Sequence, residues 1–198
     1  MSNINDILVE MEDYALKENV PIMNKEGIDF MCNLISENNV KSILEIGSAI
    51  GYSSIKMALC DKDILVTTIE RDKTRYSEAV KNINNCKLDD RINIINDDAL
   101  DTDIKGKYDL IFIDAAKGQN IKFFNKYKDN LNDKGVIVTD NMLFHGLVEE
   151  KERIRNKNLR QLVNKIKKYI EFLKDNKEYN TTFYRIGDGI AVSYKKED

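Results

Sequence analysis

Short runs rich in β-branched and aromatic residues alternate with longer amphipathic segments, and this order restricts the possible folds more than any other feature. The strand-like runs cover residues 42–47, 65–70, 91–96, 108–114 and 135–140. Helix-like segments fall between them, near 52–60, 73–85 and 119–130. Such alternation is typical of βαβ units, which form a parallel sheet with right-handed crossovers. We therefore predict a doubly wound α/β core with helices on both faces of a mostly parallel sheet.

The end of the chain departs from this alternation. Residues 181–186 and 190–195 are two β-like runs separated by Gly187-Asp188-Gly189, which predicts an antiparallel hairpin. Amphipathic helices are expected at about 4–18 and 24–37, before the core, and a long helix at about 151–175.

Length and composition favour one domain. With 198 residues and 42% hydrophobic content, the chain can bury its own core. We expect a single domain over residues 1–198, with N-terminal helices in 1–38 and the core in 39–198. The net charge of −3 gives no general reason to expect a nucleic acid or a membrane as partner.

The hydropathy pattern and the cysteines both predict a cytoplasmic location. No apolar run approaches the roughly 20 residues of a membrane span, and the N-terminus is acidic, so a cytoplasmic protein is expected. Cys32, Cys60 and Cys86 are far apart in sequence and lack a CxxC pattern. They predict thiols in a reducing compartment, without a disulfide framework or a zinc site.

Polar residues gather where the predicted strands end, which is the edge at which open parallel sheets bind ligands. The first strand runs into Glu45-Ile46-Gly47-Ser48-Ala49-Ile50-Gly51-Tyr52-Ser53, a glycine turn that suits a nucleotide-like cofactor. By itself, the GxxxG spacing of this turn is weak evidence for cofactor binding. Glu70 follows the second strand, where a carboxylate would accept bonds from ribose hydroxyls, and Asp98-Ala99 follows the third.

A second group of polar residues follows the fourth and fifth strands. Asp114, Asp140 and Asn141 offer hard oxygen donors, which suit Mg²⁺, Mn²⁺ or Ca²⁺ better than zinc. The alternative is that they are ordinary caps and turn residues. Lys117 is near enough in sequence to serve as a base, whereas His145 is interpreted as a loop residue.

Several of these segments together resemble a known family. "ILEIGSAIGYSSIKMA", "FIDAAKGQ", "TDNMLFHG" and "IGDGIAVSYK" are similar to segments of class I, metal-dependent O-methyltransferases that use S-adenosylmethionine, related to the catechol and caffeoyl-CoA enzymes. The resemblance implies a Rossmann-like seven-stranded sheet, S-adenosyl-L-methionine (SAM) as cofactor, Mg²⁺ or a similar cation, and a homodimer.

The resemblance also implies roles for individual residues. For the cofactor these are Met23, Glu45, Gly47, Ser53, Glu70, Asp98, Ala99 and Asp114. The implied metal ligands are Asp114, Asp140 and Asn141, and the implied catalytic residues are Lys117 and Asp114. Catechol enzymes carry a bulky aromatic residue where this chain has Ala115-Ala116, which makes a small catechol a doubtful substrate.

The methyl acceptor is suggested by residues 151–174, which contain nine Lys or Arg and two Glu. This segment and the C-terminal hairpin resemble bacterial methyltransferases that convert 5-hydroxyuridine to 5-methoxyuridine at the tRNA wobble position. The resemblance implies a tRNA anticodon loop as partner, with Arg155, Lys157 and Arg160 as phosphate contacts. A small-molecule catechol or hydroxycinnamoyl-CoA acceptor is the alternative. A silent cofactor-binding module and, least favoured, a nicotinamide oxidoreductase are the remaining hypotheses.

Overall fold

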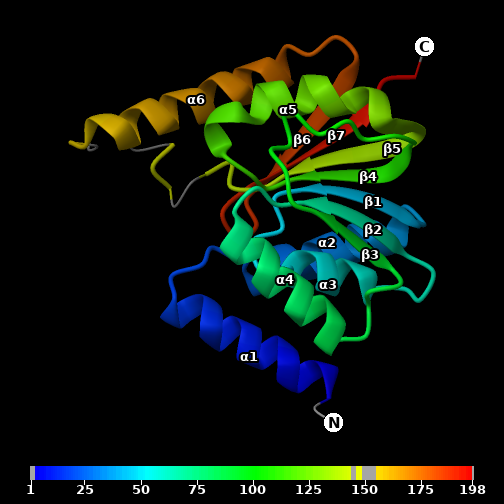
Figure 1. The fold of residues 1–198 in the computed structure, drawn as a ribbon. Helices are drawn as coiled ribbons and strands as arrows, with labels where there is room; N and C mark the ends of the chain where they lie inside the picture. The colour runs from blue at the N-terminus through cyan, green and yellow to red at the C-terminus, as the bar shows by residue number, and fades with distance from the viewer. Residues whose placement is uncertain (1–2, 144–145, 149–154, 198) are drawn as a thin grey trace. The chain divides into compact units, whose positions relative to one another are not determined.

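The structure, a computed structural model, describes residues 3–143, 146–148 and 155–197 (Figure 1). Seven strands form one sheet in the order β3-β2-β1-β4-β5-β7-β6. The β7 strand pairs antiparallel with both β5 and β6. The prediction of a mostly parallel, Rossmann-like sheet with an antiparallel end is thus confirmed. The chain forms two compact units, residues 1–103 and 104–198, which are described in turn.

The first unit contains three parallel strands and four helices. The strands are β1 (Ser42–Ile46), β2 (Leu65–Ile69) and β3 (Ile92–Ile95). The helices are α1 (Ile4–Lys17), α2 (Lys25–Glu37), α3 (Tyr52–Ala58) and α4 (Lys73–Asn85).

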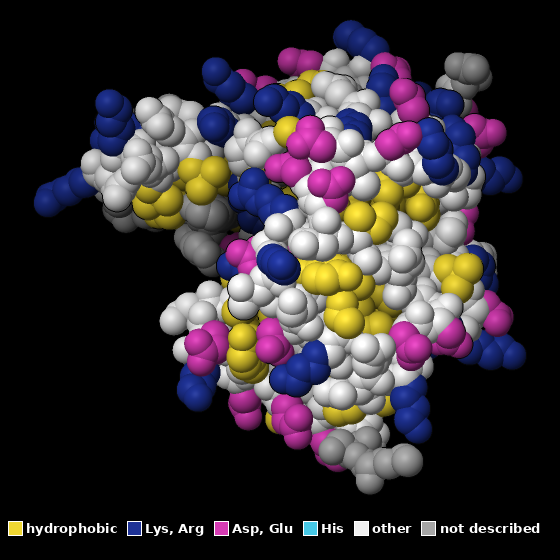
Figure 2. Space-filling view, in the orientation of Figure 1, with side chains coloured by type: hydrophobic (Ala, Val, Ile, Leu, Met, Phe, Trp, Pro, Cys, Tyr) yellow, Lys and Arg dark blue, Asp and Glu magenta, His cyan; other side chains and the backbone are white. Residues whose placement is uncertain are grey.

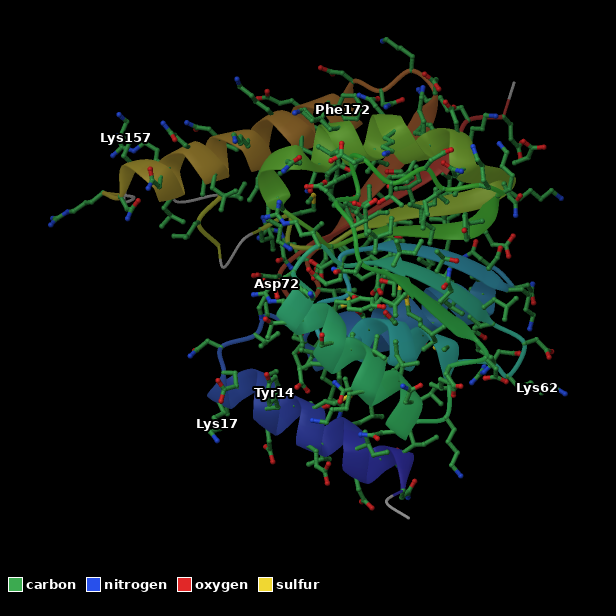
Figure 3. All side chains as sticks on the ribbon, in the orientation of Figure 1. Tyr14, Lys17, Lys62, Asp72, Lys157 and Phe172 are labelled. Carbon is green, nitrogen blue, oxygen red and sulfur yellow. The ribbon has the colours of Figure 1, made fainter. Side chains whose placement is uncertain are left out.

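The helices of this unit begin where short polar side chains can accept their first free N–H groups. The side chains of Asn3, Asn24 and Asp72 cap α1, α2 and α4 in this way. Figure 3 shows Asp72 at the start of α4. Helix α3 differs because its cap is Gly51, which supplies a left-handed turn and no side-chain bond. The connection before α3 is therefore shaped by backbone conformation, and it is the predicted cofactor turn.

The second unit contains four strands and two longer helices. The strands are β4 (Tyr108–Ile113), β5 (Leu131–Thr139), β6 (Tyr179–Tyr184) and β7 (Ile190–Lys195). The helices are α5 (Asn120–Tyr127) and α6 (Lys157–Lys174), and short 3₁₀ turns, η1 (Lys117–Gln119) and η2 (Lys128–Asn130), flank α5. In the part of the chain that the structure describes, no helix has both the length and the apolar character to span a membrane.

Several predicted boundaries in this unit were inaccurate, including that of β6, which covers Tyr179–Tyr184 and not 181–186. Strand β5 begins at Leu131, before the expected 135, because Tyr108 pairs with Leu131 ahead of a register shift and the main run. The helix expected over 119–130 is divided into η1, α5 and η2. The long helix begins at Lys157, where the Asn156 side chain caps it, and residues 151–154 lie outside the described part.

Helix α6 is anchored by an aromatic cluster at its C-terminal half. Tyr169 is buried, and its hydroxyl lies 2.8 Å from Thr139 Oγ1 on β5. The ring of Phe124 on α5 makes edge-to-face contacts with Tyr169, with Phe172 (labelled in Figure 3) and with Tyr179. In Figure 1 the N-terminal half of α6 extends beyond the end of α5. That half packs instead on Val148, through Val163 and Ile166.

The β6–β7 connection packs against the turn that follows β5. The N–H of Met142 donates to the Gly189 carbonyl at 2.9 Å, and the N–H of Leu143 donates to the Asp188 carbonyl at 2.8 Å. A Cβ on Gly189, whose φ is +86°, would lie 2.7 Å from the backbone N of Leu143. Both the backbone conformation and this close approach require glycine.

We therefore expect Gly189→Ala to lower the free energy of unfolding by about 2–4 kcal/mol, measured by urea denaturation. Gly106→Ala is the matched control, because Gly106 also has a positive φ (+92°) but a Cβ there would meet nothing within 4 Å. The control should cost only about 1–2 kcal/mol. Equal losses in the two variants would contradict the importance of this contact.

Candidate cofactor and metal sites

The glycine turn after β1 has an unusual backbone conformation. Gly47, Ala49 and Gly51 all have positive φ values, of 95°, 46° and 84°. Such values are ordinary for glycine but cost a non-glycine residue on the order of 1 kcal/mol or more. Ala49 thus adopts a conformation that glycine would favour, and surrounding bonds must hold it there.

Glu70 supplies one of those bonds. Its carboxylate is buried at the end of β2 and accepts the N–H of Ala49 at 2.9 Å and the N–H of Asp72 at 2.8 Å. One side chain therefore fixes both the glycine turn and the start of α4. Each carboxylate oxygen retains a second lone pair, so this arrangement is compatible with the predicted ribose contacts.

Glu45 has no exposed surface and lies beneath the same turn. Its carboxylate accepts the hydroxyl of Ser53 at 2.5 Å, that of Thr68 at 2.6 Å, and that of Ser54. A carboxylate buried among hydroxyl donors fixes its surroundings, since removing the donors would leave an expensive buried charge. The structure places Glu45 and Ser53 in one hydrogen-bonded cluster that joins β1, β2 and α3.

Two further observations fit a ligand with a polar, amino-acid-like portion. The Ser48 hydroxyl in the turn is buried and has no hydrogen-bond partner among the described residues. Buried polar atoms are normally paired, so the Ser48 hydroxyl beside this turn could bond a polar group of a cofactor. Met23 is also buried, and its side chain lies over Gly27, where a Cβ would meet Met23 Cε at 2.9 Å.

Asp98 and Ala99 form the turn after β3. The Asp98 side chain accepts the N–H of Leu100 at 2.9 Å and lies 3.8 Å from Arg71. Ala99 is buried next to it. This is an ordinary Asx turn, in which one carboxylate oxygen accepts the Leu100 N–H and the other lies near Arg71. The role of Asp98 and Ala99 in cofactor binding stays a prediction.

In the second unit, Asp114 follows β4 and pairs with Lys117. The ammonium nitrogen of Lys117 lies 2.6 Å from Asp114 Oδ1, and both side chains are largely shielded from solvent. The 3₁₀ turn η1, which begins at Lys117, brings the two together across three positions. The role of Lys117 as a base near Asp114 stays a prediction.

Asp140 and Asn141 follow β5 and form the other predicted part of the metal site. Asp140 is buried, and its carboxylate accepts the Asn141 amide at 2.6 Å. Burial raises the pKa of Asp140 to about 7, and repulsion from Asp114 acts in the same direction. Lys117 opposes this effect, whereas Asp188 on the β6–β7 connection adds to it. The structure thus brings Asp114, Lys117, Asp140 and Asn141 together.

The donor set suits a divalent cation by its chemistry. It contains two carboxylates and an amide oxygen, which are hard ligands, and the two carboxylates repel each other. Among the described residues, no three His, Cys, Asp or Glu side chains gather as a metal site. A cation held here would therefore rest on Asp114, Asp140 and Asn141, completed by water or acceptor oxygens. His145 lies outside the described residues.

Sequence reasoning missed three residues near this site. Asn120 begins α5 with both side-chain polar atoms buried and unpartnered among the described residues. The sequence marks Asp188 only as a turn residue. Lys165 reaches from α6 over Gly118, where a Cβ would lie 3.3 Å from its ammonium nitrogen. Only the helical spacing of the basic segment hinted at Lys165, and nothing in the sequence marked Asn120.

Comparison with known proteins identifies the family. A family model described as O-methyltransferase matches residues 2–196. The chain belongs to this O-methyltransferase family. It is accordingly a SAM-dependent enzyme of the caffeoyl-CoA and catechol type.

Curated relatives and solved structures agree with this assignment. The chain is 28% identical to the caffeoyl-CoA O-methyltransferase of Populus kitakamiensis, over 82% of this chain and 73% of the relative. It is 32% identical to the catechol O-methyltransferase of Mycobacterium tuberculosis, over 68% and 62%. A Staphylococcus aureus structure, provisionally assigned as a caffeoyl-CoA O-methyltransferase, is 41% identical with a TM-score of 0.92, covering 99% of this chain and 93% of that one.

A more distant structure shows the same fold. The SAH-bound Podospora anserina methyltransferase is 22% identical, with a TM-score of 0.87 over 97% of this chain and 88% of that chain.

The bonds of Glu70 lead to a prediction for the O-methyltransferase. Glu70→Gln replaces one acceptor by an NH₂ group, which then faces the N–H of Ala49 or Asp72. We expect SAM affinity to fall roughly tenfold or more, measured by calorimetry, because the turn loses its support. Glu78→Gln, on the surface of α4 beside Lys81, is the control and should bind normally. Unchanged affinity in Glu70→Gln would show that this carboxylate does not shape the cofactor site.

Proposed function

We propose that this O-methyltransferase transfers the methyl group of SAM to 5-hydroxyuridine at the wobble position of tRNA, giving 5-methoxyuridine, with a divalent cation. The observation that carries the proposal is Lys165, which joins the basic helix α6 to the loop of Lys117. Polyanionic ligands need positive charge close to the reacting group.

Residues of the first unit are the proposed SAM-binding residues. The glycine turn with Glu45, Gly47 and Ser53 holds the methionine part of SAM, together with Met23. Glu70 binds the ribose, and Asp98-Ala99 lies along the adenine. Asp114, which follows β4, also borders the cofactor.

Asp114, Asp140 and Asn141 are the proposed ligands of Mg²⁺, Mn²⁺ or Ca²⁺. A bound cation lowers the pKa of an acceptor hydroxyl and fixes its orientation. Lys117 is the proposed base, which in its neutral amine form would take the proton of the acceptor hydroxyl, and its 2.6 Å contact with Asp114 holds the nitrogen in place. The acceptor oxygen then bonds to the methyl carbon as the carbon–sulfur bond of SAM breaks, and the neutral SAH leaves.

The exposed side of α6 provides the proposed tRNA contacts. Arg155, Lys157 and Arg160 are exposed at and just before the helix start. Figure 2 shows Lys and Arg side chains on this projecting part of α6, and Figure 3 shows Lys157 at its free end. An anticodon loop offers unstacked bases and closely spaced phosphates, so these residues would bind the backbone while the base reaches the metal site.

A small-molecule acceptor is the second candidate, because relatives carry the names of caffeoyl-CoA and catechol O-methyltransferases. Ala115 and Ala116, which follow β4, leave more room beside Asp114 than an aromatic side chain would. This favours a large acceptor over a simple catechol, but it does not separate tRNA from a CoA ester.

A competition of acceptors tests the proposal. Purified protein with SAM and Mg²⁺ should convert 5-hydroxyuridine to 5-methoxyuridine in tRNA. Nucleoside mass spectrometry detects this conversion as the gain of one methyl group. EDTA, or Asp140→Ala, should abolish the transfer, while SAM binding by calorimetry remains within about threefold. Methylation of caffeoyl-CoA or catechol, with unmodified tRNA, would show that the small-molecule alternative is right.

Charge neutralisation on α6 provides the second test. Replacing Arg155, Lys157 and Arg160 together by Gln should weaken tRNA binding roughly 10–100-fold and reduce the salt dependence by about two to three charges. The control triple is Lys17, Lys62 and Lys73, exposed lysines of the first unit, each also replaced by Gln. Equal effects of the two triples would indicate non-specific charge attraction and would argue against α6 as the tRNA-binding element.

The proposed assembly is a homodimer. Val9 and Leu16 on α1 have exposed fractions of 56% and 82%, and their seven-residue spacing places them on one helix face. An exposed apolar face of this kind is suited to a second copy of the chain. Light scattering of the purified protein gives its mass directly.

A further inference from the structure

The structure places two cysteines side by side, although they are 28 positions apart in sequence. The sulfur atoms of Cys32 on α2 and Cys60, two residues after α3, are 2.8 Å apart. Both are free thiols and half-buried, so neither is sealed from solvent. The third thiol, Cys86, is buried elsewhere in the same unit.

The contact is asymmetric, which assigns different roles to the two thiols. The Cys60 thiol donates toward Cys32 Sγ, and it also lies 3.3 Å from the carbonyl oxygen of Lys56. Cys32 therefore receives the hydrogen bond, and the cationic side chain of Lys56 also favours its thiolate. The hydrogen bond is the main effect lowering the pKa of Cys32, against burial and the charge of Asp29.

We propose that Cys32 and Cys60 are a reversible redox site that forms an intramolecular disulfide when the protein meets a peroxide. The Cys32 thiolate attacks the peroxide oxygen, the O–O bond breaks, and Cys32 becomes a sulfenic acid as the peroxide leaves as water or an alcohol. The Cys60 thiol then attacks the sulfenic sulfur, forming the S–S bond and releasing water. Two thiols thus lose two electrons to one peroxide, and a dithiol reductant restores them.

The geometry makes Cys60 the resolving thiol. The disulfide bond length is about 2.0 Å, so the sulfurs need to move by less than about 1 Å to form it. A sulfenic acid on Cys32 would be formed in contact with its reaction partner. Further oxidation of Cys32 and linkage between molecules would both be slower than this internal step.

The disulfide would connect α2 to the end of α3, closing a loop of about 30 residues in the unfolded chain. Such a link restricts the unfolded ensemble more than the folded state. We expect the oxidised protein to melt about 5–10 °C higher than the reduced protein.

Mass spectrometry of the full chain tests the proposal. One equivalent of hydrogen peroxide should lower the intact mass by about 2 Da, the mass of two hydrogen atoms, with the Cys32–Cys60 peptide as the cross-linked product. Dithiothreitol should restore both thiols to alkylation. Cys86 serves as the internal control and should stay reduced.

Two serine variants separate the roles of the thiols. In Cys60→Ser, peroxide should add one or more oxygen atoms to Cys32, whereas in Cys32→Ser the Cys60 thiol should react at least tenfold more slowly. If a variant does not fold, peptide mapping of the unaltered protein decides alone. Oxygenated Cys32 with Cys60 still open to alkylation, or two unreactive thiols in the native protein, would overturn the proposal.

Discussion

The first unit depends on a carboxylate that has no contact with solvent. Glu45 sits in β1, between hydrophobic residues, and three hydroxyls from α3 and β2 direct their hydrogens at it. An unpaired carboxylate there would cost several kcal/mol, so β1, β2 and α3 must keep their relative positions for the charge to be tolerated. These bonds also hold the turn between β1 and α3 in place. The turn can therefore keep Ala49 in a left-handed conformation that a flexible loop would not maintain.

In the second unit, by contrast, the buried carboxylates are not fully compensated by their neighbours. Asp114 and Asp140 repel each other, and the nearby cation of Lys117 and amide of Asn141 only partly offset the repulsion. The first unit satisfies its buried charge internally, while the second leaves a surplus of negative charge. A divalent cation would offset that surplus, which is compatible with the proposed metal site.

Much of the fold follows from local patterns that the sequence displays openly. The buried runs of β1 and β4 are apolar almost throughout, as expected for strands covered on both faces. Edge strand β6 instead alternates buried or half-buried residues with exposed ones. The early start of β5 at Leu131 was not predictable, because it depends on a register shift against β4 and not on the polar residues that follow it.

The sequence predicted which residues form each site, but it did not reveal the contacts that hold those residues in place. Glu70 was expected to face a ribose, and the finding that it also supports the backbone of Ala49 required the fold. The same is true of Cys32 and Cys60, whose separation in sequence suggested unrelated thiols. Local spacing reports on contacts within one helix or turn, such as Asp114 with Lys117. Contacts between elements depend on packing, which a single sequence records only indirectly.

The distinction between local sequence patterns and contacts between elements also applies to helix α6 and the methyl acceptor. The apolar face of α6 explains why the helix forms, because Val163 and Ile166 pack on Val148 and Tyr169 bonds to Thr139. Val148, Val163 and Ile166 form that cluster without the basic residues of α6, and like charges on one helix destabilise it slightly. Lys165 over Gly118 shows that the basic face reaches the loop of the proposed base. Positive charge placed beside the loop of Lys117 is compatible with the proposed acceptor, which carries phosphates.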